Sequence, residues 1–388
     1  MNFAFNTTPA LRCGIGLAGR LGETCGSLLG SRILFITDAG LTGLGLTKPA
    51  LASLRDAGAT VEVFDAVEAD PSLATLMGAA ENARAMGATG VVGFGGGSSM
   101  DVAKLAALLA GSGEDLDQAW GVGNARGPRL PLVLVATTAG TGSEVTPVSI
   151  ITVGGDEKRG VSSPVILPDM AVLDAELTTG LPRAATAATG IDAMVHAIEA
   201  YTSQSANNNP VSRMLACQAL QLLGGNIRTA CEDGGDLEAR QNMLLGSMLA
   251  GMAFANSPVA AVHALAYPIG GMFHIPHGLS NALILADVMR FNLPACHQAY
   301  AELFPNAFPG LAAEAAGEGS QGQAARFIAA LSTLSADIGL PPRLRDVGIG
   351  ADDLPVMAAA AMKQTRLLVN NPREVGEADA LAIYKAAW

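Results

Sequence analysis

The sequence predicts an α/β domain, with a parallel sheet covered by helices on both faces, followed by an all-helical domain. Strand-like and helix-like segments alternate up to about residue 182, and helical periodicity dominates from there to residue 388. Two glycine-rich loops also follow apolar strands in the first half. Because 388 residues are enough for two substantial cores, we expect domains at 1–182 and 183–388.

The elements of the first domain follow from short apolar runs that alternate with longer amphipathic runs. The expected strands are 32–38 (RILFITD), 60–65 (TVEVFD), 89–94 (TGVVGF) and 130–138 (LPLVLVATT). The expected helices are 47–59, 71–88 and 99–111. The Gly-rich and polar segment 111–131 is expected to be an excursion before the strand at 130–138. Later segments such as 193–203, 211–227 and 237–254 have helical spacing of their apolar residues.

Composition excludes several classes of protein. The net charge is −12 and no basic patch is present, which argues against a nucleic-acid or anionic-membrane partner. The five scattered cysteines form no C-x-x-C pair, and the N-terminus does not resemble a signal peptide, so we expect reduced thiols in a cytoplasmic protein. Low charge and abundant apolar helices suggest a homodimer or a larger homo-oligomer.

The segment Met243–Phe273 is long and almost uncharged, as a membrane span would be. Polar residues and two prolines interrupt it, and it lacks flanking basic residues. We therefore predict a buried core helix, a break and a second helix.

The segment Gly90–Lys104 (GVVGFGGGSSMDVAK) joins a strand to a helix through three glycines and two serines. Glycine lets the backbone approach an anion closely, and a helix N-terminus presents unpaired N–H groups, so the junction suits a diphosphate. Ser98 or Ser99 can cap the helix or donate to a phosphate oxygen. The loop is neither a G-x-G-x-x-G fingerprint nor a Walker loop. A triple glycine is also an ordinary tight turn, and Asp101 is an acid near a helix start.

A second polar loop, Thr137–Pro147 (TTAGTGSEVTP), also follows an apolar strand. Loops at the carboxyl ends of strands in one α/β sheet converge on the crevice where ligands bind, so the pair predicts a nucleotide site. Asp38 ends the first clear strand, where it can accept from an adenosine ribose hydroxyl and repel a 2′-phosphate. The alternative for Asp38 is a plain turn aspartate.

A group of metal-binding residue types lies in the helical half. Asp192 and His196 are spaced i and i+4, so they project from one helix face, and His263, His274 and His277 follow downstream. A single histidine of this kind is usually a core residue bonded to backbone, but several together in apolar surroundings need partners or a metal. The expected ligands of a divalent metal ion are Asp192, His196, His263 and His277. His274 could face the ion or the substrate, or be structural.

Five blocks of the sequence resemble the iron-containing (group III) alcohol dehydrogenases. They are GGGSSMDVAK, TTAGTGSEVTP, GIDAMVHAIEAYTS, HALAYPIGGMFHIPHGLSNA and NPREVGEADALAIYKAAW, in family order and over essentially the whole chain. The resemblance implies a nucleotide-binding α/β domain and an all-helical metal-binding domain, a fold like that of dehydroquinate synthase, with the active site in the cleft.

The same resemblance implies roles for individual residues. The diphosphate loop matches Gly95, Gly96, Gly97, Ser98 and Asp101. The adenine- and nicotinamide-side loop matches Thr137, Thr138, Thr141 and Ser143. Lys158 stands where family members have a cofactor-contacting lysine, and Asp38 where an acid accompanies NAD. The metal ligands match Asp192, His196, His263 and His277. The expected catalytic side chains are His263, His277, His274 and Tyr267.

Two positions depart from the family pattern. Many members have a second histidine four residues after the third ligand, and this chain has Tyr267 there. A tyrosine at this position resembles the branch of the family that includes hydroxyacid–oxoacid transhydrogenases. Ala286 stands where a proline is common, which we interpret as structural. The intact metal set argues against the related maleylacetate reductases.

The expected function is an NAD-dependent, metal-dependent alcohol dehydrogenase or aldehyde reductase with a small substrate. A divalent ion acts as a Lewis acid toward the substrate oxygen, and the nicotinamide carries the hydride. Three imidazoles and one carboxylate suit Fe²⁺ or Zn²⁺ alike, so iron follows from the resemblance alone. The alternatives are a hydroxyacid dehydrogenase or transhydrogenase, a metal- and NAD-dependent lyase or synthase, and a non-enzymatic binding protein.

Overall fold

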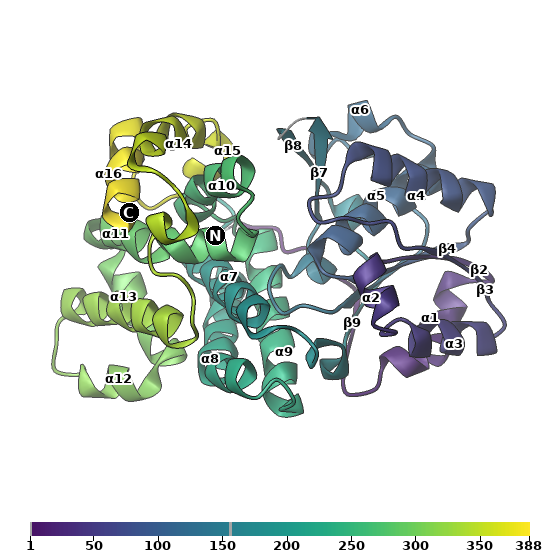
Figure 1. Cartoon of the computed structure of the whole chain (residues 1–388), viewed down its shortest axis with the longest axis horizontal. Coiled ribbons are helices and arrows are strands. Elements are labelled where there is room, and N and C mark those ends of the chain that lie inside the picture. Colours follow the sequence, from purple (N-terminus) through teal and green to yellow (C-terminus); the bar gives the residue numbers. More distant parts are fainter. Residues whose placement is uncertain (1, 155–156) are drawn as a thin grey trace. The chain divides into compact units, whose positions relative to one another are not determined.

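The computed structural model describes residues 2–154 and 157–388. Within them the chain forms two compact units, which we call the α/β unit (Asn6–Thr179) and the helical unit (Gly180–Trp388). The first residues of the chain belong with the helical unit, because the backbone of Ala4 exchanges two 2.9 Å hydrogen bonds with the side chain of Asn207. The predicted fold class is confirmed: a parallel sheet with helices and a separate helical part (Figure 1).

Six strands form the main sheet of the α/β unit, and every neighbouring pair is parallel. In sheet order they are β1 (Ala10–Cys13), β9 (Met170–Leu173), β6 (Leu132–Ala136), β4 (Gly90–Gly95), β2 (Arg32–Ile36) and β3 (Thr60–Phe64). All residues of β4 and β6 are buried, as expected for central strands covered on both faces.

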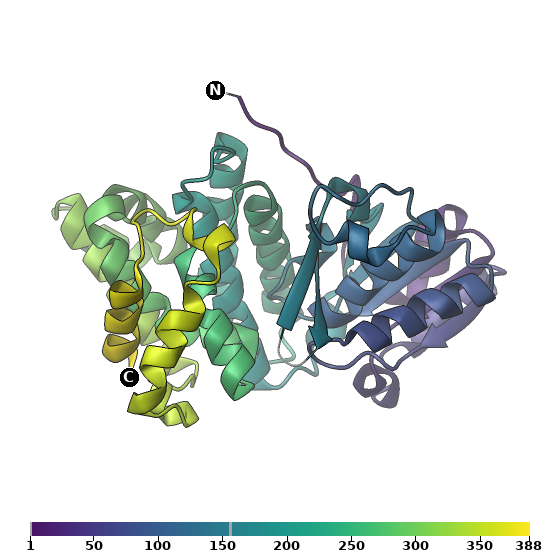
Figure 2. The same ribbon diagram turned by 90° about the horizontal axis from the view of Figure 1, so that it is seen from above.

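Helices cover both faces of this sheet, as the alternating pattern predicts (Figures 1 and 2). They are α1 (Leu21–Leu29), α3 (Lys48–Asp56), α4 (Leu73–Ala85) and α5 (Gly97–Ser112). Phe35 and Phe94 belong to the buried core beneath α1 and α3. On the opposite face, a Cβ on Gly93 would lie 2.6 Å from the Cβ of Ala103 in α5. The glycine therefore lets α5 pack directly against β4.

Smaller elements complete the α/β unit. They are α2 (Ala39–Gly43), α6 (Leu116–Ala119) and a second sheet of β5 (Gly121–Val122), β8 (Glu157–Ser162) and β7 (Val148–Gly154). β7 and β8 are antiparallel, whereas β5 and β8 are parallel. The expected excursion at 111–131 thus contains a short helix and a short strand.

The order of the strands reverses between β2 and β4. The chain passes from β2 to β3 on one side, then returns through α4 to β4 on the other side of β2, and continues outward to β6. Such a reversal leaves a crevice at the carboxyl ends of the strands, where open α/β sheets bind ligands. Asp38 follows β2, Gly96 follows β4 and Thr137 follows β6, so the fold brings these predicted residues to one edge of the sheet.

The helical unit contains ten α-helices in its described residues. They are α7 (Arg183–Thr202), α8 (Pro210–Glu232), α9 (Leu237–Asn256), α10 (Ala261–Phe273), α11 (His277–Ala307), α12 (Pro309–Glu314), α13 (Ser320–Asp337), α14 (Leu354–Ala361), α15 (Thr365–Leu368) and α16 (Glu377–Ala387). Sixteen of the twenty residues of α7 are buried. This helix is rich in alanine, so neighbouring helices can approach it closely from several sides.

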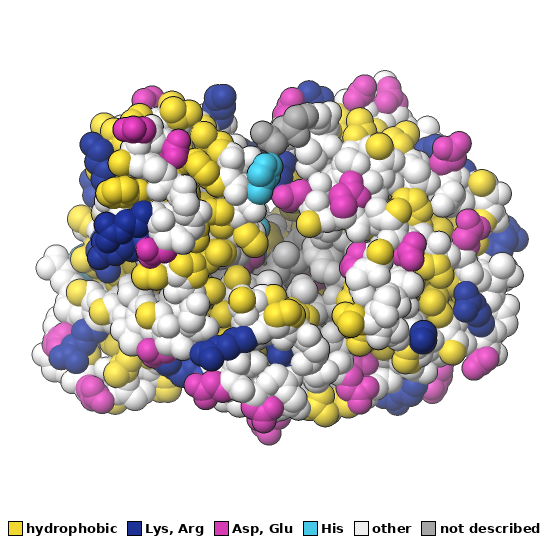
Figure 3. All heavy atoms as spheres, viewed as in Figure 1, with side chains coloured by type: hydrophobic (Ala, Val, Ile, Leu, Met, Phe, Trp, Pro, Cys, Tyr) yellow, Lys and Arg dark blue, Asp and Glu magenta, His cyan; other side chains and the backbone are white. Residues whose placement is uncertain are grey.

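The prediction of a helix, a break and a second helix within Met243–Phe273 is confirmed, since α9 ends at Asn256 and α10 begins at Ala261. Among the described residues, no helix alone has the length and apolar composition to cross a membrane, although the α9–α10 pair, bent by 108°, meets both criteria jointly. The five cysteines are thiols outside any disulfide. Charged side chains of both signs are interspersed on the face drawn in Figure 3.

Candidate functional site

Three helices of the helical unit bring four potential metal ligands together. α7 supplies Asp192 and His196, α10 supplies His263, and α11 begins with His277. One ligand atom from each of the four lies within 4.8 Å of all the others. Oδ1 of Asp192 is 3.7 Å from Nε2 of His277, 3.9 Å from that of His263 and 4.0 Å from that of His196. The structure therefore places all four predicted ligands in one cluster.

The sequence around each ligand explains this convergence. The i, i+4 spacing puts Asp192 and His196 on one face of α7. The residue after His277 is Gly278, and a Cβ there would lie only 2.5 Å from the backbone oxygen of Ala188. Only a glycine lets the start of α11 approach α7 this closely, and this approach carries His277 to Asp192.

The donor set fits a divalent cation of the Fe²⁺ or Zn²⁺ type, because imidazole nitrogens and a carboxylate oxygen are its common ligands. Ligand atoms about 2.1 Å from a tetrahedral ion lie roughly 3.4 Å apart, slightly less than the 3.7–4.0 Å between Asp192 Oδ1 and the three histidine Nε2 atoms. The amide nitrogen of Asn281 lies among these atoms, 2.6 Å from Oδ1 of Asp192 and 3.3 Å from Nε2 of both His263 and His277. The Oδ1 atom of Asn281 is buried and accepts no hydrogen bond from the described residues.

Burial and charge make this cluster asymmetric. The side chains of Asp192, His196 and His263 are buried, whereas that of His277 is 47% exposed. Burial by itself raises the pKa of Asp192, but His196, His277 and His263, with the hydrogen bond from Asn281, outweigh it and hold the pKa below its ordinary value. A buried carboxylate that stays ionised is suited to attract a cation, and His277 marks the side from which a small molecule can reach it.

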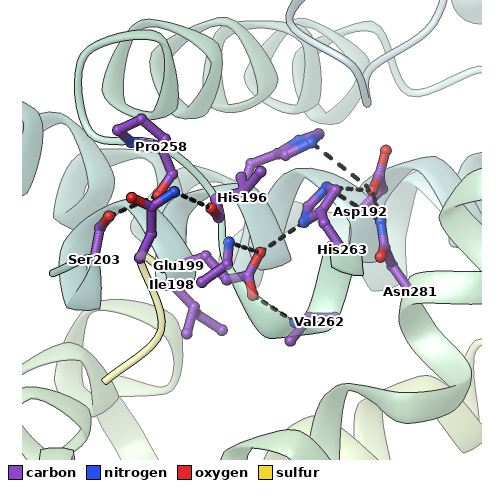
Figure 4. A network of polar contacts seen from close by, with 12 residues as sticks. Asp192, His196, Ile198, Glu199, Ser203, Pro258, Val262, His263 and Asn281 are labelled. Carbon is purple, nitrogen blue, oxygen red and sulfur yellow. Dashed lines mark hydrogen bonds and ion pairs between the residues drawn. The ribbon is translucent and has the colours of Figure 1, made fainter. Parts of the chain in front are cut away.

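Two residues that sequence reasoning missed complete the cluster (Figure 4). Glu199 lies on α7 beside the ligands, with its Oε2 atom 2.6 Å from Nδ1 of His263. Asn281 contacts Asp192 from α11. Their spacing carried a signal, because residues 192, 196 and 199 share a face of one helix, and Asn281 is four residues after His277.

The remaining candidates in this half lie outside the four-ligand group. His274 is exposed and is the left-handed C-cap residue of α10, with φ of 55°. Tyr267 is half-buried, and its ring centre lies 6.4 Å from that of His277. The Tyr267 hydroxyl accepts a 3.3 Å hydrogen bond from Nη2 of Arg366. Tyr267 is thus near the ligands, while His274 has a position set by the end of its helix.

The two polar loops of the α/β unit lie against each other. Thr137 N donates to the oxygen of Gly95 at 3.0 Å. Cβ atoms on Gly96 and Gly97 would lie 3.5 Å from Oγ1 of Thr138 and 3.0 Å from Cγ2 of Thr141. The contact is tight at Gly97 and ordinary at Gly96, so close approach of the second loop favours glycine at Gly97.

The start of α5 differs from the prediction in one respect. The helix begins at Gly97, with Gly96 as N-cap. The prediction that Ser98 or Ser99 caps the helix was therefore wrong. Because glycine has no side chain, the N-cap residue leaves the first N–H groups of this long helix uncovered. Together with the strand reversal at β2 and β4, this makes a suitable cradle for an anionic diphosphate.

The side chains of Asp101 and Ser143 hold the two loops together. Asp101 Oδ1 accepts from Ser143 Oγ at 2.7 Å, and its Oδ2 accepts from Ile150 N at 2.9 Å. The fully buried Lys104 donates to Ser143 Oγ at 2.7 Å and to the oxygen of Val148 at 2.6 Å. The side chains of Asp101 and Ser143 thus make hydrogen bonds within the protein.

Asp38 and Lys158 also have partners within the α/β unit. Asp38 is the N-cap of α2, where its Oδ1 accepts from Leu41 N at 3.0 Å. This is the turn role that the sequence left open, and it still leaves a carboxylate at the end of β2. Lys158 Nζ, on β8, lies 2.5 Å from Oδ1 of Asp70.

Comparisons with known proteins identify the family of the chain. Family models described as "Iron-containing alcohol dehydrogenase" and "Fe-containing alcohol dehydrogenase family, C-terminal" match residues 8–175 and 186–388. The chain is 40% identical over 384 residues to long-chain-alcohol dehydrogenase 1 of Geobacillus thermodenitrificans, covering 98% of this chain and 95% of that protein.

Two solved structures are similar over the whole chain. That of a 1,3-propanediol oxidoreductase has a TM-score of 0.95 at 36% identity and covers 100% of both chains. A sulfoacetaldehyde reductase from Bifidobacterium kashiwanohense, in complex with NAD⁺, has a TM-score of 0.87 at 27% identity, covering 100% of this chain and 99% of that one. The chain therefore belongs to the iron-containing alcohol dehydrogenase family and is an oxidoreductase that acts on CH–OH groups.

Proposed function

We propose that this protein is an NAD-dependent, divalent-metal-dependent alcohol dehydrogenase or aldehyde reductase with a small substrate. The observation that carries the proposal is the convergence of Asp192, His196, His263 and His277 to within 4.8 Å in a member of this family. The helical unit would hold the metal and the α/β unit the cofactor.

The four ligands would hold Fe²⁺, or alternatively Zn²⁺. Such an ion supplies Lewis-acid chemistry toward the oxygen of an alcohol or a carbonyl group. The Asp192 carboxylate contributes negative charge, and three neutral imidazoles complete the donor set. His277 and Tyr267 border the exposed side of the cluster, where they would contact and orient the substrate.

The loops after β4 and β6 would bind NAD, which supplies the hydride chemistry. The N-terminus of α5, with Gly95, Gly96 and Gly97, would hold the diphosphate, and Ser98 would donate to its oxygens. Thr137, Thr138 and Thr141 would line the adjoining loop. Asp101 and Ser143 would act by holding these loops in register, because their side chains already bind each other. NAD⁺ in the related sulfoacetaldehyde reductase structure supports this cofactor.

The substrate class is proposed from the relatives. The matched proteins are named for a long-chain alcohol, for 1,3-propanediol and for sulfoacetaldehyde, all of which carry or form a primary alcohol. We therefore propose a primary alcohol, or the corresponding aldehyde, as the substrate.

The test measures NADH formation by chelator-treated protein that receives Fe²⁺ anaerobically or Zn²⁺, with primary alcohols, 1,3-diols and hydroxyacids as substrates. Activity should return with metal. In Asp192→Ala it should fall by more than about 100-fold, beyond the 10- to 100-fold typical of residues behind the ligands. The matched control is His297→Ala, because His297 binds Ser320 and lies outside the four-ligand group.

Three results would contradict the proposal. Parent-like turnover in Asp192→Ala would show that Asp192 is not needed to hold a catalytic metal. Hydride exchange between a hydroxyacid and an oxoacid without added NAD⁺ would identify a transhydrogenase. Cofactor binding without NADH formation on any substrate would favour a lyase or synthase.

The cellular setting and assembly belong to the same proposal. Five thiols outside disulfides support a cytoplasmic location. Exposed apolar side chains on the helical unit, such as Met214 and Val356, support self-association. Sedimentation of the purified protein should give at least a dimer.

A further inference from the structure

Glu199 is a buried carboxylate that three donors surround. Its side chain is 5% exposed, and its Oε1 accepts from Val262 N at 2.7 Å. Its Oε2 accepts from Ala260 N at 3.0 Å and lies 2.6 Å from Nδ1 of His263 (Figure 4). One side chain of α7 thus contacts both the start of α10 and a potential metal ligand on it.

The start of α10 explains why a carboxylate is present. Ala260 is the N-cap residue and offers no side-chain cap. The first N–H groups of a helix have no intrahelical partner, and the helix dipole favours negative charge there. Glu199, on the neighbouring helix α7, supplies a negative charge and an acceptor oxygen for each of the N–H groups of Ala260 and Val262.

These contacts determine where the proton of His263 resides. Backbone N–H groups only donate, so both oxygens of Glu199 act as acceptors, and Nδ1 of His263 is left as the donor in the third bond. In the neutral ring, Nε2 then carries no proton and has a free lone pair. This atom is the one that faces Oδ1 of Asp192, at 3.9 Å.

We propose that Glu199 is a positioning residue that fixes His263 in the Nδ1–H tautomer and in the ring orientation required for metal binding. Carboxylates behind metal-binding histidines act in this way, and their loss typically lowers metal affinity by 10- to 100-fold. The inference rests on the proposed metal site and extends it to a residue that does not itself touch the ion.

The variant that tests this is Glu199→Gln, which keeps the size of the side chain. A glutamine has one acceptor oxygen where the carboxylate has two. If that oxygen replaces Oε1 and accepts from Val262 N, the amide NH₂ replaces Oε2, faces Nδ1 of His263 and moves the ring proton to Nε2, where it opposes metal binding. If the oxygen replaces Oε2, it still accepts from Nδ1 and from Ala260 N, so a second variant, Glu199→Ala, removes every acceptor for Nδ1. The matched control is Glu302→Gln, which removes a carboxylate bound by the Tyr201 hydroxyl in the same unit and outside the four-ligand group.

The measurement is the apparent Kd for Zn²⁺ and Co²⁺, determined on the full-length protein by chelator competition, with the Co²⁺ absorption spectrum as a report on ligand geometry. Glu199→Gln should bind 10- to 100-fold more weakly and change the Co²⁺ spectrum. Glu302→Gln should remain within twofold of the parent in both. Thermal unfolding of the chelator-treated proteins separates loss of affinity from loss of stability.

Parent-like affinity and spectrum in both Glu199→Gln and Glu199→Ala would show that Glu199 only caps α10, and would overturn the inference while leaving the metal site intact. A parent protein that bound neither ion would overturn the metal site as well. If Glu199→Gln does not fold, ¹⁵N-histidine NMR of the unaltered metal-free protein decides the question. The Nδ1–H tautomer is expected for His263, and the Nε2–H tautomer would contradict the proposal.

Discussion

At the scale of single residues, the α/β unit contains a buried group of charges between α5 and the loop after β6. Burial lowers the pKa of Lys104 and raises that of Asp101, and each residue's charge partly opposes the shift of the other. Burial also raises the pKa of Glu144 to about 7, against the attraction of Lys104. The charge of Lys104 is attracted by both acids, and Asp101 also accepts hydrogen bonds from Ser143 in the loop and from Ile150 in β7.

The raised pKa of Glu144 predicts a pH-dependent stability. Between pH 4.5, where an ordinary glutamate ionises, and about pH 7, the folded state binds more protons than the unfolded state. The free energy of unfolding therefore falls as pH rises through this window and levels off above it. Glu144→Gln should match the parent at pH 4 and exceed it at pH 8 by roughly 1–3 kcal/mol. Thermal unfolding across this range checks the prediction, and a difference that does not vary with pH would contradict it.

Asp38 allows a residue-scale test of cofactor choice. Asp38→Asn retains a good N-cap for α2 but removes the charge expected to repel a 2′-phosphate. The ratio of kcat/KM for NADPH to that for NADH should rise by about 10-fold or more, which is about 1.4 kcal/mol of discrimination. Steady-state kinetics with both cofactors measure this ratio. An unchanged ratio would leave Asp38 as a helix cap only.

At the scale of elements, two adjacent glycines of α8 should respond in opposite ways to the same substitution. A Cβ on Gly224 would lie 2.3 Å from the backbone oxygen of Ala307, whereas one on Gly225 would meet nothing within 4 Å. Gly224→Ala should therefore destabilise by about 1–3 kcal/mol, and Gly225→Ala should stabilise by about 0.5–1 kcal/mol. Each variant is the control for the other in denaturant unfolding. Equal effects would mean that α8 and the end of α11 do not pack this closely.

Element boundaries depended on features that periodicity does not contain. The strand at 89–94 and the helix after it were predicted from apolar pattern, but the helix begins at Gly97 and not at Ser99. The sequence suggested a serine cap because serine commonly ends the preceding loop. In the structure Gly96 is the N-cap, and a Cβ on the next residue, Gly97, would lie 3.0 Å from Cγ2 of Thr141, so the loop after β6 crowds the start of the helix.

At the scale of the whole molecule, a bound ion would connect three helices that are distant in the chain. A metal ion present at about 100 times its Kd adds roughly 2.7 kcal/mol to the stability of the folded structure that binds it. We expect Zn²⁺ to slow amide hydrogen exchange in α7, α10 and the start of α11, and to leave the main sheet unchanged. Asp192→Ala should abolish this response. Uniform protection across both units, or none, would contradict the prediction.

The sequence by itself determined the alternation of strands and helices, the residue types of the metal cluster and the polar loops after β4 and β6. These features are local, because helical and strand periodicity and i, i+4 spacing depend on neighbours along the chain. Only the tertiary structure decided that Glu199 contacts His263, 64 residues away, and that Asn281 contacts Asp192, 89 residues away. The physical reason is that such contacts depend on how closely α7, α10 and α11 pack, and that packing is set by residues such as Gly278, whose importance becomes visible only when two helices meet.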